Sequence, residues 1–319
     1  MSVKIQSDRN VFLDTLKGIL IIFVVIGHSP SVGSSSKIIF SIIYCFHMPA
    51  FFVLSSLNLK SRFRDELKGV KLILIIYLFW LIFSTLKNNS NFFNVLLFSN
   101  WQHLKNILWF LPALIIFKLY FSLLSVRNLK ILFFTLGIFS ILYSDILLYY
   151  LEFIPWGINI AVYMTPCILV LKELYNRIDF ISNYPSDKSI IIISTLFIAS
   201  LISFIYVESS LGHAFPYYYL DFAQFVVPTI YGYIFLFLMM FSIIALTKVN
   251  IKDSWLSFLG KNTMPIYLFH YFFILLIPNI LPINNYIAWV LLIILSIIFP
   301  LMISSLLKKI TIYFKYLGA

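Results

Sequence analysis

Three ionisable residues near the N-terminus, Asp14, Lys17 and His28, have the types and the spacing for acid–base and anion-binding chemistry. An imidazole can take a proton from a hydroxyl near neutral pH, and a lysine can hold a phosphate as a point charge. An α-helix advances about 16 Å over eleven residues and returns to within about 20° of its starting direction. Lys17 and His28 would therefore share one helix face, with Asp14 beside Lys17 at the i, i+3 spacing.

The helix that must carry this face is also the first predicted membrane span. Its uninterrupted apolar run, 19–26, is shorter than the roughly 20 residues that cross a bilayer, so the span includes polar groups. Ionisable side chains at membrane depth are costly and usually face a protein interior or a wet cavity. We therefore predict that this face forms one wall of an active site. The structural alternatives are a snorkelling Lys17 that pairs with Asp14, and a His28 that is hydrogen-bonded near the outer surface.

The composition excludes an ordinary soluble domain. Of the 319 residues, 61% are hydrophobic and only 11% are charged, whereas soluble domains carry about 25% charged residues. The net charge is +11, and the basic residues lie between apolar runs, where they act as topology signals. This placement argues against nucleic acid as a partner. Cys45 and Cys167 lie inside predicted spans and indicate no disulfide framework. We expect residues 11–28 to be a retained helix rather than a signal peptide.

The predicted fold class is all-α: a polytopic integral membrane protein with about ten transmembrane helices, forming a single domain over residues 1–319. The apolar stretches cover residues 11–28, 38–57, 72–86, 106–125, 131–150, 157–175, 189–207, 224–247, 263–281 and 287–307. Basic residues gather in alternate loops and at both ends, which places both termini in the cytoplasm by the positive-inside rule. We expect a multi-pass protein of the cell membrane, in contact with lipid, and the Ile-, Phe-, Asn- and Lys-rich composition fits a low-GC bacterium.

Several stretches are similar to elements of one known family. RNVFLDTLKGILIIFVVIGH resembles the first-helix signature of membrane acyltransferase family 3, in which a basic residue, here Lys17, stands ten positions ahead of a Gly-His pair. Many members have arginine at that position. The segment 46–55, FHMPAFFVLS, resembles the family's Phe-His-Met-Pro element, with Ser56 in place of the usual glycine. Segments 108–114 and 260–270 also look like family elements, closest to the branch of fucose O-acetylases and exopolysaccharide O-acetyltransferases.

The resemblance implies that His28 is the catalytic residue and that acetyl-CoA is the acyl donor. Lys17, at the cytoplasmic mouth, would hold the phosphates of the donor, and the thioester would reach His28 three turns away. Lys68 and Lys71, one helical turn apart in the most basic loop, would add to the phosphate site, where members commonly have arginines. Their alternative role is to orient the chain and contact anionic lipid. The five histidines form no HExxH-type motif, so no metal is expected.

Four further residues are candidates for supporting the site or binding the acceptor: Asp14, His47, Trp109 and His270. Asp14 could orient the neighbouring lysine. His47 is expected to be buried, and His270 shares a helix face with Tyr267 and Thr263 at the i, i+4, i+7 spacing. Either histidine could bind acceptor hydroxyls or be structural, and the structural role is favoured slightly for His270. Trp109 could stack on a sugar ring or belong to an interfacial aromatic belt.

The predicted function is O-acyl transfer from cytoplasmic acetyl-CoA to a hydroxyl of a cell-surface or capsular saccharide, or of its lipid-linked precursor. The hydroxyl would attack the thioester directly with His28 as base, or the acyl group would pass through an acyl-enzyme. A saccharide transporter or flippase and a non-catalytic partner of a polysaccharide synthase are the competing classes. A sugar transporter has no need of the Lys17–His28 face with a basic inner loop beside it, which favours the enzyme.

Overall fold

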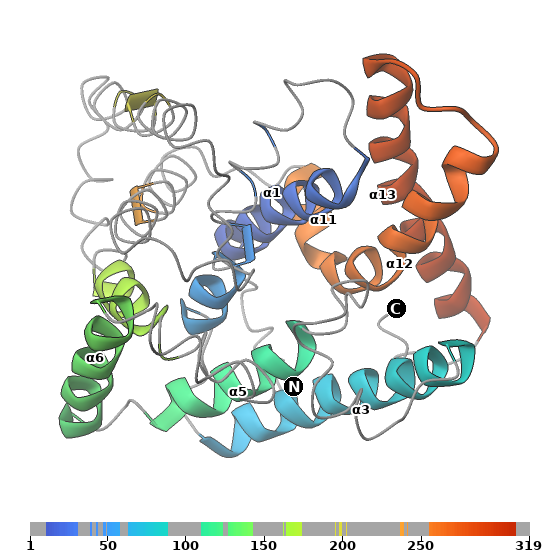
Figure 1. Ribbon diagram of the computed structural model, residues 1–319. Coiled ribbons are helices and arrows are strands. Elements are labelled where there is room, and N and C mark those ends of the chain that lie inside the picture. Colours follow the sequence, from blue (N-terminus) through green and yellow to red (C-terminus); the bar gives the residue numbers. More distant parts are fainter. Residues whose placement is uncertain are drawn as a thin grey trace, which may run out of the picture.

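The regular structure of the described residues is entirely helical in the computed structural model, as predicted (Figure 1). The structure describes residues 11–30, 39, 43, 47, 48, 50–57, 63–88, 110–123, 127–142, 162, 164–173, 195, 198, 199, 202, 237, 238, 241 and 255–310. The elements are α1 (Val11–His28), α3 (Phe63–Asn88), α5 (Phe110–Leu123), α6 (Arg127–Leu142), α11 (Trp255–Lys261), α12 (Thr263–Leu276), the 3-10 helix η4 (Ile277–Asn279) and α13 (Tyr286–Ile310). The segments 50–57 and 164–173 are also helical.

Predicted spans at both ends of the chain coincide with helices. The first span has the bounds of α1, and the last two correspond to α12 with η4 and to α13. Within the described part of the chain, α1 and α13 are long and apolar enough to cross a membrane. The predicted spans 189–207 and 224–247 lie almost wholly outside the described residues.

Two elements differ from the prediction. Helix α3 begins at Phe63 rather than at residue 72. Its first turns carry charged residues, which are compatible with a helix but do not give the apolar pattern from which the spans were predicted. Lys68 and Lys71 therefore lie on this helix and not in a loop. Helix α11 lies where an inner loop was expected, because its seven residues are too few and too mixed to give a span-like pattern.

Helix α1 packs most closely against α11, and the two backbones meet at glycines on both sides (Figure 1). A Cβ atom added to Gly18 would collide with the backbone carbonyl of Leu256, and would lie 3.2 Å from the backbone nitrogen of Gly260. A Cβ added to Gly260 would collide with the backbone of Asp14. Small residues allow such close approach where lipid removes the usual hydrophobic drive for helix association. The contact therefore fixes α11 beside the polar end of α1.

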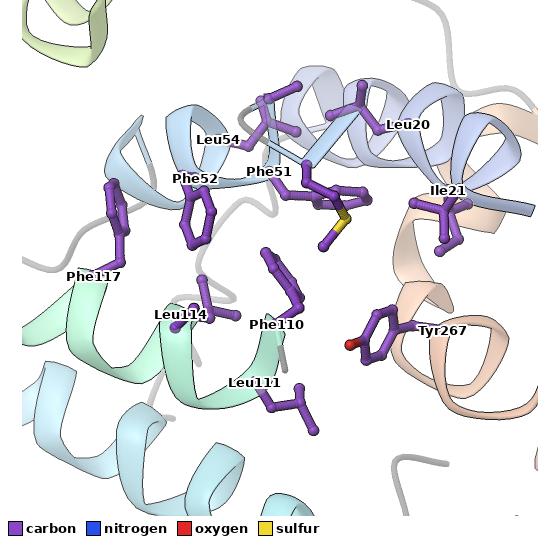
Figure 2. Packing of buried hydrophobic residues seen from close by; sticks show 14 of the residues in the cluster. Leu20, Ile21, Phe51, Phe52, Leu54, Phe110, Leu111, Leu114, Phe117 and Tyr267 are labelled. Atoms are coloured by element: carbon purple, nitrogen blue, oxygen red, sulfur yellow. The ribbon is translucent and has the colours of Figure 1, made fainter. Parts of the chain in front are cut away.

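An aromatic core joins the 50–57 segment, α5 and α12. Figure 2 shows Phe51 and Phe52 of the 50–57 segment facing Phe110 and Phe117 of α5, with Tyr267 of α12 alongside. The ring centroids are 5.2 Å apart for Phe52 and Phe110 and 5.7 Å apart for Phe110 and Tyr267. Aromatic pairs at such distances stabilise packing beyond the area that they bury. The core thus holds α12 and α5 in one fixed relation.

Helix α13 has one apolar face that no described element covers. Its exposed large hydrophobic residues lie along one side of the helix: Ile287, Val290, Leu291, Ile294, Ile298, Met302 and Leu306. The opposite face, which includes Trp289 and Leu292, is buried against α12 and α1. An exposed apolar stripe of this length is what a helix presents to lipid and would be a liability in water.

We predict that Gly260→Ala destabilises the folded protein, because the new methyl group overlaps the backbone of Asp14 and neither backbone can move aside alone. Overpacking of this kind costs about 1–3 kcal/mol. The measurement is the unfolding temperature of the full chain in detergent, followed by size-exclusion chromatography after heating.

The matched control is Gly69→Ala on α3, where an added Cβ meets no atom within 4 Å. That substitution should leave the unfolding temperature unchanged or raise it, because alanine favours helix over glycine. Equal unfolding temperatures for the two variants would contradict the proposed backbone contact.

Candidate active site

The N-terminal half of the polar face of α1 holds an ion pair whose carboxylate is buried beside α11. The Nζ atom of Lys17 lies 3.5 Å from Oδ1 of Asp14, as the i, i+3 spacing predicts. The Asp14 side chain is 3% exposed and that of Lys17 is 26% exposed. A buried carboxylate needs a compensating charge, which the lysine supplies. The ammonium group remains partly accessible at this end of the helix.

The C-terminal end of the same face is His28, the last residue of α1. Its ring is partly buried and contacts two residues of α12: the centroid distances are 5.3 Å to His270 and 6.0 Å to Tyr271. Both ends of the face that was predicted from spacing therefore contact protein: Asp14 lies against α11, and His28 lies against His270 of α12.

His47 and His270 are both buried and both held by main-chain carbonyls of their own helical turn. Nδ1 of His47 lies 2.7 Å from the carbonyl oxygen of Ile43. Nδ1 of His270 lies 3.0 Å from the carbonyl of Ile266 and 2.8 Å from that of Tyr267. Because a carbonyl only accepts hydrogen bonds, Nδ1 carries the hydrogen in both neutral rings. Nε2 of each ring is thus left with its lone pair.

The fold assembles His28, His47 and His270 into one cluster from three distant segments. Each pair of these imidazoles is close enough to interact electrostatically. Only His28 is partly exposed, while His47 is 1% and His270 0% exposed. His28 is therefore the member of the cluster that is accessible from outside the protein. Among the described residues, no group of three or more His, Cys, Asp or Glu side chains is arranged to hold a metal ion.

The residue after His28 is anchored to α13. Nε1 of Trp289 donates a hydrogen bond of 2.9 Å to Oγ of Ser29, and this hydroxyl donates one of 2.6 Å to the carbonyl of Ile26. Both side chains are buried. The C-terminal turn of α1 therefore has a fixed position relative to α13, and with it the backbone that carries His28.

The remaining predicted site residues lie on another helix or outside the described part of the chain. Lys68 and Lys71 are exposed residues of α3, which packs against α5. Trp109 lies outside the described residues. Its neighbour Phe110 is hydrogen-bonded through its backbone to the Tyr267 side chain, which links the beginning of α5 to α12.

Sequence reasoning missed a buried ion pair between α3 and α5. Nζ of Lys118 lies 3.1 Å from Oε2 of Glu66, with side chains 17% and 2% exposed. Lys118 is an isolated cation inside an apolar stretch, and such a residue needs a partner of opposite charge. The sequence therefore indicated that Lys118 needs an acidic partner, but it did not indicate which of the chain's acidic residues would be that partner.

Comparison with known proteins adds one finding. The model of the acyltransferase domain of acyltransferase family 3 matches residues 10–306, which is nearly the whole chain. No curated protein and no solved structure matches the chain.

We predict that Trp289→Phe lowers the stability of the protein by about 1 kcal/mol, because the ring is kept but the hydrogen bond to Ser29 is lost. The unfolding temperature in detergent measures the change. Trp255→Phe is the control, since Trp255 is 65% exposed on α11 and the same substitution there should have no effect. A Trp289→Phe protein as stable as the wild type would show that this anchor is dispensable.

Proposed function

The chain belongs to acyltransferase family 3, and from that premise we propose that it is a membrane O-acetyltransferase. The donor is cytoplasmic acetyl-CoA, and the acceptor is a hydroxyl of a cell-surface or capsular polysaccharide or of its lipid-linked precursor. The observation that carries the proposal is the position of His28, a partly exposed imidazole at the end of a polar helix face that also holds the Asp14–Lys17 pair.

His28 acts as the general base in this proposal. The acceptor oxygen attacks the thioester carbonyl carbon while the imidazole takes the hydroxyl proton. The carbon–sulfur bond then breaks, and the departing thiolate recovers the proton from the imidazolium. The histidines behind His28 support this role, because neutral buried rings leave it as the accessible group that can take up the proton.

The donor lies along α1. Lys17 holds its phosphates, and the thioester at the end of the long pantetheine arm reaches His28, eleven residues and about 16 Å further along the helix. Asp14 orients the Lys17 side chain through the ion pair. Lys68 and Lys71 contribute positive charge to the approach of the anionic donor.

The proposal includes a single domain over residues 1–319 with ten transmembrane helices, both termini in the cytoplasm, in the cell membrane of a bacterium. The exposed apolar stripe of α13 and the exposed apolar residues of α6 support a lipid environment. His47, Trp109 and His270 line or support the acceptor side in this arrangement.

We predict that His28→Ala lowers acetyl transfer by at least about 100-fold, because general-base catalysis contributes 10²–10⁴-fold. Membranes that contain the full chain are incubated with acetyl-CoA labelled in the acetyl group, and label in the saccharide fraction is counted. His213→Ala is the chemically matched control, because it removes an imidazole that lies outside the predicted spans, between 189–207 and 224–247. Transfer by His28→Ala at the wild-type rate would contradict the proposed role, and wild-type membranes that export polymer without incorporating label would favour the transporter class.

We predict that Lys17→Gln raises the KM for acetyl-CoA by about 10-fold, because one charge-assisted contact to phosphate is lost. Lys17→Arg should keep the wild-type KM, since it preserves the charge.

A second variant separates binding from stability. Lys17→Gln leaves the buried Asp14 carboxylate without its ion pair, whereas Lys17→Gln with Asp14→Asn removes both charges. The double variant should regain stability but keep the raised KM. A normal KM in the stable double variant would show that Lys17 has no part in binding the donor.

A further inference from the structure

His270 holds a buried hydrogen-bond acceptor that nothing described satisfies. Its ring is 0% exposed, and Nδ1 donates to the carbonyls of Ile266 and Tyr267. Nε2 is buried, and among the described residues it has no hydrogen-bond partner. Buried polar atoms nearly always have a hydrogen-bond partner. An unpaired one at a candidate active site therefore indicates that its hydrogen bond forms in another conformation of the site.

The partner of this Nε2 must be a donor, because Nδ1 already carries the hydrogen of the neutral ring. Ring contacts of His270 among the described residues are with His28, at 5.3 Å, and with Tyr267, at 6.2 Å. Tyr267 points its hydroxyl toward the beginning of α5, where it is hydrogen-bonded to the backbone of Phe110 (Figure 2). His47 donates through Nδ1 to Ile43, which leaves it a lone pair and no second donor. His28 is the neighbour that can supply an N–H.

The order of burial gives the two rings different roles. His28 is partly exposed and His270 is fully buried, so a substrate meets His28 first and His270 lies behind it. A group behind a general base can fix which of the two ring nitrogens of that base carries the hydrogen, and how the ring is oriented. A neutral histidine can do so without placing an unpaired charge in the membrane interior.

We propose that His270 is a positioning residue for His28: in the catalytic arrangement of the site, the His28 ring turns so that Nε2 of His270 accepts a hydrogen bond from it, and the lone pair of His28 is directed at the acceptor hydroxyl. The inference deepens the proposed acyl transfer and rests on it. When His28 takes the hydroxyl proton, its other N–H still donates to His270, and no bond to His270 forms or breaks. The two carbonyls on Nδ1 hold the His270 ring in place for this task.

Two substitutions of His270 separate its two nitrogens. Asparagine places an amide N–H near the position of Nδ1, which can still donate to the carbonyls, but leaves nothing at Nε2. Glutamine places its amide near the position of Nε2, where the oxygen can accept from His28. A purely structural role that depends on the carbonyl contacts would favour the asparagine variant, whereas the proposed role favours the glutamine variant.

We predict that His270→Asn lowers kcat for acetyl transfer by about 100-fold, with the KM for acetyl-CoA within twofold of the wild type. His270→Gln should recover to within about 10-fold of the wild-type kcat. The assay uses labelled acetyl-CoA and membranes that contain the cell's own saccharide acceptors. A His270→Asn enzyme with kcat within threefold of the wild type, or a loss that appears only in KM, would overturn the inference.

A spectroscopic measurement tests the same inference without activity. The chain has five histidines, so nitrogen-15 NMR of imidazole-labelled protein can be assigned by single substitutions. The wild type should show one tautomer of His28, and His270→Asn should show a mixture. An unchanged His28 tautomer in His270→Asn would overturn the inference. If the wild type transferred no label but showed one His28 tautomer that became a mixture in His270→Asn, the positioning role would be supported and acyl transfer would be refuted.

Discussion

The backbone contact between α1 and α11 is the constraint on which the arrangement of the candidate site depends. Gly260 of α11 lies directly against the backbone of Asp14, and Gly18 lies against that of Leu256. Side chains of any size at these glycines would separate the helices. Because α12 follows α11 after one residue, the position of α11 also determines where α12 begins and where His270 meets His28.

A second constraint is that polar groups inside an apolar protein need partners. Asp14 pairs with Lys17 on one helix, and Glu66 pairs with Lys118 between two helices. The buried histidines use carbonyls of their own helices instead. The two kinds of pairing differ in the groups that stay available for further interactions. An ion pair uses the charges of both residues, whereas an imidazole that donates through Nδ1 keeps Nε2 as a hydrogen-bond acceptor.

Local features of the sequence predicted much of the site. The bounds of α1, the proximity of Asp14 and Lys17, and the burial of His47 all follow from spacing and hydropathy within one helix. The position of α11 and the contact of His28 with His270 could not be predicted in this way, because they depend on how helices distant in the sequence pack. The slight preference for a structural His270 rested on α12 alone, and it stays a prediction.

The hydrogen bonds that hold the two buried histidines end on the main chain. The carbonyl oxygens of Ile43, Ile266 and Tyr267 are present whatever side chain stands at those positions. Comparative genomics would therefore register constraint on the histidines alone, and no covarying position would reveal what orients them. The anchoring of His47 and His270 is inherited with the helical backbone and is invisible to sequence statistics.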